Sequence, residues 1–202
     1  MSDIKCPLCN SSSKYYITFR NKDYYMCEGC KSIFMDSKFY LDPEKEKDRY
    51  LLHNNDVDDL GYQKFVKPII DYTIDNFTGS NPGLDFGAGH GPVISTLLKR
   101  MSYDIEMYDP FFHNQKELLK KKYDYIISCE VIEHFHNPAK EFLALKQMLN
   151  SGGKLILKTD ILKPETDFSK WYYKNDSTHV FFYSIDSCNE IFVRFTFFEN
   201  VR

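Results

Sequence analysis

The fold follows from one stretch, Leu84-Asp85-Phe86-Gly87-Ala88-Gly89-His90-Gly91, which joins an apolar run to three glycines at every second position. Glycine has no Cβ and adopts positive φ readily, so the backbone can turn sharply and a ligand can approach it closely. Pro92 suits the first turn of a helix, and the apolar residues after it have helical spacing. The stretch predicts a strand, a tight turn and a helix whose free N–H groups face a polar or anionic ligand group.

The spacing of these glycines separates two classes of cofactor site. A dehydrogenase sequence, G-x-G-x-x-G, would need a glycine where Pro92 stands. The observed D-x-G-x-G-x-G resembles motif I of the class I S-adenosylmethionine (SAM)-dependent methyltransferases. That resemblance implies that Gly87, Gly89 and Gly91 contact the cofactor and that Asp85 lies near its methionine end. On this stretch alone, a glycine-rich turn of another α/β domain remains the alternative.

A second candidate cofactor residue follows the next predicted strand, Ile105 to Tyr108. In α/β cofactor domains, a carboxylate about 20 residues beyond the glycines binds the ribose hydroxyls. Asp109 occupies that place. The alternative is an aspartate that only starts the Asp109-Pro110 turn.

Four segments together resemble the cofactor half of a class I methyltransferase of the ubiquinone-biosynthesis-like branch: LDFGAGHG, MYDP, YDYIISCEVIEHFHNP and SGGKLILKT, over residues 62–159. The resemblance implies a Rossmann-like α/β sheet. One departure concerns the short interval from Pro110 to Tyr123, which predicts that the usual third strand is shortened or missing. The acidic residue that binds adenine on that strand therefore has no counterpart here.

Two C-x-x-C pairs near the N-terminus, separated by 17 residues, have the spacing of a four-cysteine zinc site. The four cysteines are Cys6, Cys9, Cys27 and Cys30. The aromatic residues between the pairs predict the hairpin of a zinc ribbon. A closed shell of four thiolates leaves no open position, so the zinc would be structural. Two disulfides are the alternative.

Length and composition limit the organisation of the chain. Its 202 residues suffice for one sizeable core and a small module. We expect a zinc ribbon at 1–41, a helical linker at 42–60 and a SAM-dependent methyltransferase domain at 61–202. With the ribbon and the later aromatic segment, the chain resembles bacterial methyltransferases that carry an N-terminal zinc-binding module. The net charge of -3 gives no support for nonspecific nucleic-acid binding. The chain shows no signal peptide and no membrane-spanning run, which predicts a cytoplasmic protein without membrane contact.

The catalytic candidates follow the predicted strand that ends near Cys129, because ligands of open α/β sheets bind beyond the carboxyl ends of the strands. Glu130 comes first and is assigned to the cofactor site. His134 is the candidate general base, since imidazole titrates near neutral pH. The alternative is a histidine that holds the loop by a backbone hydrogen bond. His179, farther along the chain, is the second catalytic candidate.

A metal is a further alternative at the same place. Glu130, Glu133 and His134 have an E-x-x-E-H spacing that resembles the metal site of small-RNA 3'-terminal 2'-O-methyltransferases. In those enzymes a downstream histidine completes the site, and His179 would take that role.

The C-terminal part of the chain is rich in aromatic residues. The segment from Trp171 to Tyr183 interleaves them with polar groups, which fits either a core or the wall of an acceptor pocket. The alternation from Phe192 to Phe198 predicts a terminal strand. Far upstream, His53-Asn54-Asn55 forms a polar turn that could lie near the cofactor.

The function expected from these observations is SAM-dependent methyl transfer to an oxygen, nitrogen or carbon of an unidentified acceptor. A small molecule is favoured as the acceptor, with RNA and protein open. The alternative is a zinc-ribbon adaptor for RNA or protein whose methyltransferase-like domain does not turn over. The oligomeric state is open.

Overall fold

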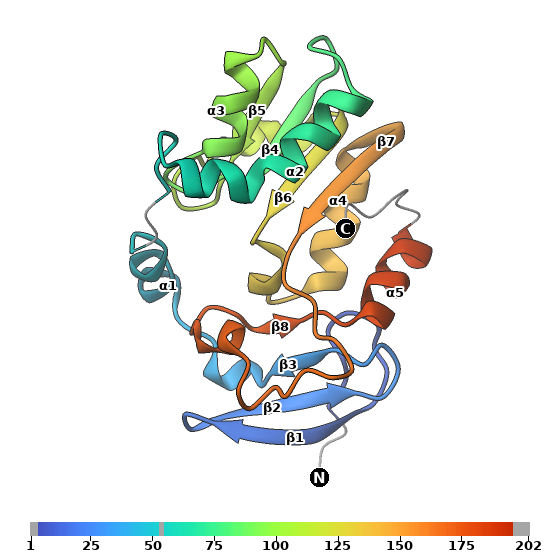
Figure 1. The fold of residues 1–202 in the computed structure, drawn as a ribbon. Coiled ribbons are helices and arrows are strands. Elements are labelled where there is room, and N and C mark those ends of the chain that lie inside the picture. Colours follow the sequence, from blue (N-terminus) through green and yellow to red (C-terminus); the bar gives the residue numbers. More distant parts are fainter. Residues whose placement is uncertain (1–3, 53–54, 196–202) are drawn as a thin grey trace. The chain divides into compact units, whose positions relative to one another are not determined.

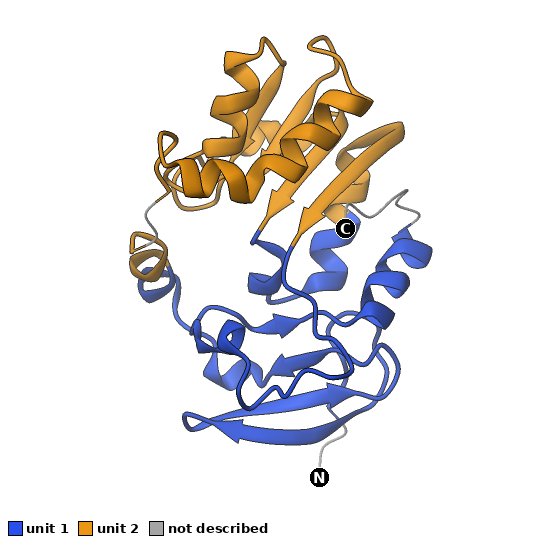
Figure 2. Cartoon of the chain, in the orientation of Figure 1, with its two compact units in different colours: residues 1–46, 130–143, 159–196 blue, residues 47–129, 144–158, 197–202 orange. Residues whose placement is uncertain are grey.

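The structure is a computed structural model and describes residues 4–52 and 55–195. The chain forms two compact units (Figure 2). Unit 1 comprises the described residues within 1–46, 130–143 and 159–196, and unit 2 comprises those within 47–129 and 144–158. The cysteine-bearing segment therefore shares a unit with two segments from the second half of the chain.

Unit 1 contains a four-stranded antiparallel sheet in the order β1-β2-β3-β8 (Figure 1). Its strands are β1 (Ser13–Phe19), β2 (Lys22–Cys27), β3 (Ile33–Met35) and β8 (Phe181–Phe182). The first two form the predicted hairpin. Arg20 and Asn21 make its two-residue turn with φ of 49° and 61°, as the turns that match strand twist require. The fourth strand comes from the aromatic C-terminal segment.

The core of unit 1 is aromatic. Tyr24, Met35, Phe168 and Phe182 are nearly inaccessible to solvent and belong to one cluster. The rings of Phe168 and Phe182 meet edge to face at 5.1 Å. Most of the segment from 171 to 183 is therefore core. Burial of such large side chains contributes about 1.5–3 kcal/mol each to folding.

The helices of unit 1 are short: η1 (Ser37–Phe39), η3 (Ile132–His134), η4 (Tyr172–Asn175) and α5 (Ile185–Phe195). Two further helices, α1 (Pro43–Tyr50) and α4 (Pro138–Met148), contain boundaries between the units. The predicted terminal strand is wrong for Phe192 to Phe195, which end α5. The buried positions Ser187, Ile191 and Phe195 recur every four residues, the period of a helix. Residues 196–198 lie outside the described residues.

Unit 2 contains a parallel four-stranded sheet in the order β5-β4-β6-β7, which confirms the predicted α/β class. The strands are β4 (Gly83–Phe86), β5 (Ile105–Tyr108), β6 (Tyr123–Cys129) and β7 (Leu149–Lys158). Residues 109–122 contribute no strand to this sheet, as predicted, and contain the short helix η2 (Lys116–Lys120). The chain passes from β5 on one side of β4 to β6 on the other, so the carboxyl ends of β4 and β6 flank the switch point where such sheets bind ligands.

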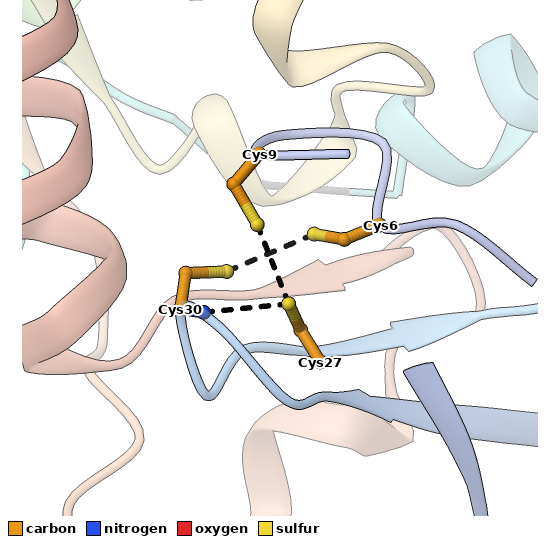
Figure 3. A group of neighbouring side chains, drawn as sticks. All are labelled: Cys6, Cys9, Cys27 and Cys30. Atoms are coloured by element: carbon orange, nitrogen blue, oxygen red, sulfur yellow. Dashed lines mark hydrogen bonds between the residues drawn. The ribbon is translucent and has the colours of Figure 1, made fainter. Parts of the chain in front are cut away.

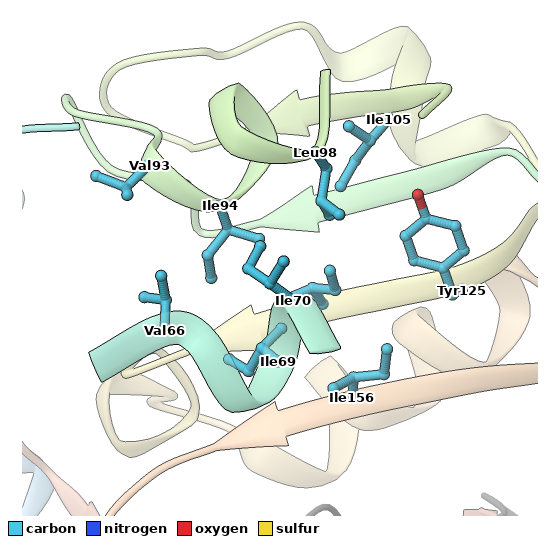
Figure 4. Close-up of a cluster of buried hydrophobic side chains, with 10 residues drawn as sticks. Val66, Ile69, Ile70, Val93, Ile94, Leu98, Ile105, Tyr125 and Ile156 are labelled. Atoms are coloured by element: carbon cyan, nitrogen blue, oxygen red, sulfur yellow. The ribbon is translucent and has the colours of Figure 1, made fainter. Parts of the chain in front are cut away.

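Two helices, α2 (Leu60–Asn76) and α3 (Val93–Arg100), cover the core of unit 2 (Figure 4). Val66 and Ile69 of α2 and Leu98 of α3 are at most 1% exposed. They pack with Ile105 and Ile156 from the strands. Asp59 caps α2 by accepting hydrogen bonds from the first free N–H groups. This packing fixes the start of α3, which directly follows the glycine loop.

Within the described residues, no helix combines the length and the apolar character that spanning a membrane requires.

Candidate functional site

The glycine loop after β4 has the conformation that its sequence predicts. Gly87 and Gly89 adopt φ of 81° and 66°, in the region that favours glycine. Gly91 is needed for a different reason, because a Cβ there would overlap the backbone carbonyl oxygen of Asn55. Asn55 thus lies against the loop, while His53 and Asn54 fall outside the described residues.

Asp109 ties this loop to the turn that follows β5. One carboxylate oxygen accepts the N–H of Gly89 at 3.0 Å, and the other accepts those of Phe111 at 2.8 Å and Phe112 at 3.1 Å. The side chain is 7% exposed. The turn-forming role is therefore present. The ribose contact stays a prediction, and a carboxylate has acceptor capacity left for it.

Asp85 lies in β4, two residues before Gly87, and is 4% exposed. Its Oδ2 accepts the backbone N–H of Ser95 in α3 at 3.2 Å. Burial raises the pKa of Asp85 to about 6, although the hydrogen bond from Ser95 acts to lower it. Asp85 thus joins strand and helix, and its contact with the cofactor stays a prediction.

A second group of polar side chains lies in unit 1, around Glu133. The Glu133 side chain has no exposed surface. The Tyr173 hydroxyl donates a short hydrogen bond to its Oε1, and the Thr159 hydroxyl donates to Oε2 at 3.1 Å. Tyr173 also lies 3.0 Å from Oε2 of Glu130. Burial raises the pKa of Glu133 to about 7, although these hydrogen bonds favour the ionised form.

His134 and His179 lie next to this carboxyl group. Nδ1 of His134 is 3.0 Å from the Thr178 carbonyl oxygen, and Nδ1 of His179 is 2.7 Å from that of Tyr173. A carbonyl oxygen only accepts hydrogen bonds, so both Nδ1 atoms carry the proton. The two Nε2 atoms are 4.0 Å and 3.9 Å from Oε1 of Glu133. The loop-holding hydrogen bond of His134 is therefore present, and it is made by Nδ1.

We call Glu133, His134, His179 and Tyr173 the Glu133 cluster. Glu133 and the two histidines can each offer a ligand atom within 4.8 Å of the others. Glu130 is outside that group and joins it through Tyr173. Tyr173 and Thr159 were not singled out from the sequence. The available signal for Thr159 was its place immediately after β7, at a strand end like Glu130.

The four cysteines converge as their spacing predicts (Figure 3). The Sγ atoms of Cys6 and Cys30 are 3.7 Å apart, and those of Cys9 and Cys27 are 3.4 Å apart. Tetrahedral zinc thiolates, with Zn–S of about 2.3 Å, place sulfurs at similar separations. The Cys30 N–H also points at Sγ of Cys27 at 3.3 Å. All four thiols are free and mutually close, which fits one metal centre better than two disulfides.

The fold and the glycine loop define an α/β protein with a Rossmann-like cofactor-binding sheet. Residues 60–197, more than half of the chain, match the family described as a methyltransferase domain, and the chain belongs to this family.

A search of curated proteins gives no match. Among solved structures, the chain is similar to coclaurine N-methyltransferase bound to N-methylheliamine and SAH, with a TM-score of 0.41 and 15% identity. The similarity covers 77% of this chain and 57% of that enzyme.

Proposed function

We propose that the protein is a SAM-dependent methyltransferase that transfers a methyl group to an oxygen, nitrogen or carbon of a small-molecule acceptor. The observation that carries this proposal is the D-x-G-x-G-x-G loop in a chain of the methyltransferase family. The order of the motifs supports the ubiquinone-biosynthesis-like branch. We propose a reducing compartment, the cytoplasm, where cysteines persist without disulfides.

The cofactor would be bound at the switch point of the parallel sheet. Gly87, Gly89 and Gly91 would let it approach the backbone, and Asp109 would accept hydrogen bonds from its ribose hydroxyls. Asp85 would lie near the methionine end of the cofactor, and its hydrogen bond to Ser95 holds the start of α3. Glu130, which directly follows β6, completes the proposed cofactor residues.

His134 would act as the general base. SAM supplies an activated methyl group, so the protein must orient a nucleophile and remove its proton. The Nδ1–H tautomer leaves the lone pair of Nε2 to accept that proton, and the neighbouring Glu133 carboxylate would stabilise the imidazolium that forms. His179 has the same tautomer and would assist beside His134, since the centroids of the two imidazole rings are 4.8 Å apart.

Replacing His134 tests this assignment. His134→Gln should lower turnover at least 100-fold, within the range that general bases contribute, and leave SAM affinity nearly unchanged. The matched control is His136→Gln, because His136 is exposed and stacks on Tyr40 outside the cluster. Full activity of His134→Gln would contradict the assignment.

The same geometry supports a second mechanism, with a divalent cation at the cluster. One carboxylate and two imidazoles whose Nδ1–H groups bind backbone carbonyls form a ligand set that leaves positions open for substrate. Chelation that spares the cysteine centre separates the mechanisms. Activity that is lost and then restored by Mg²⁺ or Mn²⁺ supports the cation, and unchanged activity supports the general base alone.

The cysteine centre would hold structural zinc, since four converging thiolates give a closed tetrahedral shell. The adaptor alternative is not favoured, because the family match supports an enzyme. The proposed function is tested with SAM carrying a labelled methyl group, offered with small-molecule, RNA and protein fractions separately. Label in the small-molecule fraction supports the proposal, label in RNA or protein reassigns the acceptor, and no transfer to any fraction supports the adaptor.

A further inference from the structure

The cysteine centre and the Glu133 cluster belong to the same compact unit, and several hydrogen bonds connect them. The first begins at the second C-x-x-C pair. The Ser184 hydroxyl donates to the carbonyl oxygen of Cys30 at 2.6 Å, and both residues are buried. Ser184 follows His179 by five residues, so this bond anchors the segment that carries His179.

A second connection runs through Tyr183, whose ring is completely buried. Its hydroxyl donates to the carbonyl oxygen of Ile132 at 2.9 Å, one residue before Glu133. Burial raises the pKa of Tyr183, and the nearby Glu133, Cys6 and Cys30 add to that effect. Tyr183 therefore contacts the turn that carries Glu133 and lies within electrostatic range of two cysteines.

The backbone between these side chains forms a third connection. β3 starts three residues after Cys30 and pairs with β8. Just beyond that pairing, the N–H of Met35 donates to the carbonyl of Val180 at 2.8 Å. The N–H of Val180 donates in turn to the carbonyl of Glu133 at 2.9 Å. The strand that leaves the cysteine centre thus reaches Glu133 through two hydrogen bonds.

The first C-x-x-C pair is also held from this unit. Leu8, between Cys6 and Cys9, accepts a hydrogen bond from Arg194 of α5 at 2.8 Å through its carbonyl oxygen. Neither C-x-x-C pair is therefore an isolated module.

We infer that the four-cysteine centre positions Glu133 and His179, and that Tyr183 and Ser184 are the positioning residues through which it does so. A metal bound by the four thiolates fixes Cys30. The segment from Val180 to Ser184 then holds Glu133 and His179 in their positions. The positioning of Glu133 and His179 does not depend on the proposed function. Only the expected effect on turnover rests on the proposed function.

Tyr183→Phe tests the inference, because it removes one hydroxyl and keeps the ring. The variant should bind Co²⁺ at the cysteine centre with the same thiolate charge-transfer absorption as the wild type. The ring ¹⁵N signals of His134 and His179 should move, and turnover should fall about 10-fold or more at unchanged SAM affinity, as expected for misplaced catalytic groups. Ser184→Ala should have the same effects, and it provides a second variant if Tyr183→Phe folds poorly.

Tyr125→Phe is the matched control. It also removes a buried tyrosine hydroxyl, but this hydroxyl has no hydrogen-bond partner among the described residues and lies in unit 2. Its histidine signals and turnover should equal those of the wild type. Unchanged histidine signals in both Tyr183→Phe and Ser184→Ala would overturn the inference. If the wild type transfers no methyl group, the histidine signals still decide the inference, and only the proposed function fails.

Discussion

Glu133 is the residue whose environment departs most from that of an ordinary carboxylate. It is fully buried beside two imidazole Nε2 atoms, and burial raises its pKa to about 7. Under the general-base proposal, the cluster must lose its proton before it accepts one from the acceptor. The rate of methyl transfer should therefore rise with pH and reach half its maximum near pH 7.

Glu133→Gln should move the midpoint of this pH dependence, because glutamine does not titrate whereas the imidazole of the general base is retained, and should lower the maximal rate at least 10-fold. The measurement is kcat/KM against pH. Glu141→Gln, which changes a half-buried glutamate of α4, serves as control. A pH profile of Glu133→Gln that superimposes on that of the wild type would contradict the role of Glu133.

Asp85 gives a prediction about stability. Its pKa is raised by burial from 3.8 to about 6. The folded state thus holds this proton more tightly than the unfolded state, so the contribution of Asp85 is fully present below pH 3.8 and is lost as pH rises through about 6. Asp85→Asn should lack this loss. Between pH 4 and pH 7, the free energy of unfolding of the wild type should fall relative to the variant by about 2 kcal/mol, measured by urea denaturation. Equal pH dependence would show that Asp85 is not desolvated.

At this scale, the sequence indicated His134 and His179 as candidates because of residue type and place. It could not indicate their tautomers, which depend on the carbonyl groups of Thr178 and Tyr173. The sequence could not distinguish Tyr173 from the neighbouring aromatic residues, most of which are part of the core. The cluster depends on long-range contacts, and residue patterns along the chain do not encode those.

At the scale of elements, the glycine loop permits a controlled substitution. Gly91→Ala would place a Cβ against the backbone of Asn55 and should force the two segments apart. SAM affinity should fall at least 10-fold, a loss of about 1.4 kcal/mol in binding free energy. Gly152→Ala is the control. Gly152 also has a positive φ, 77°, that disfavours alanine, but a Cβ added there would meet open space. Equal SAM affinities of the two variants would show that the loop does not bind the cofactor.

Local patterns predicted the elements that have one strong signal. The strand, turn and helix around the glycines and the hairpin are present, and the described residues 109–122 contribute no strand to the parallel sheet. The prediction of a terminal strand was wrong for Phe192 to Phe195, because the short alternation after Phe192 overlaps a helical period that begins at Ser187. β8 was not predicted, because two residues are too few to show a pattern and its pairing partner lies about 150 residues earlier in the chain.

At the scale of the whole molecule, the two units combine segments that are distant in sequence. Removal of metal from the cysteine centre should therefore increase amide hydrogen exchange in three segments together, within 1–46, 130–143 and 159–195. Exchange in the parallel sheet of unit 2 should stay low, because its core contains none of the four cysteines. Increased exchange confined to the first 41 residues would instead indicate an independent zinc ribbon.

Calorimetric titration of the zinc-loaded protein with SAM and S-adenosylhomocysteine shows whether this chain binds the cofactor that the proposed function requires. NADH is the control ligand, because the glycine spacing excludes the dehydrogenase pattern. We expect micromolar binding of both sulfur nucleosides, no binding of NADH, and weakened binding of SAM in Gly91→Ala. Absence of SAM binding by the zinc-loaded wild type would contradict the proposed function.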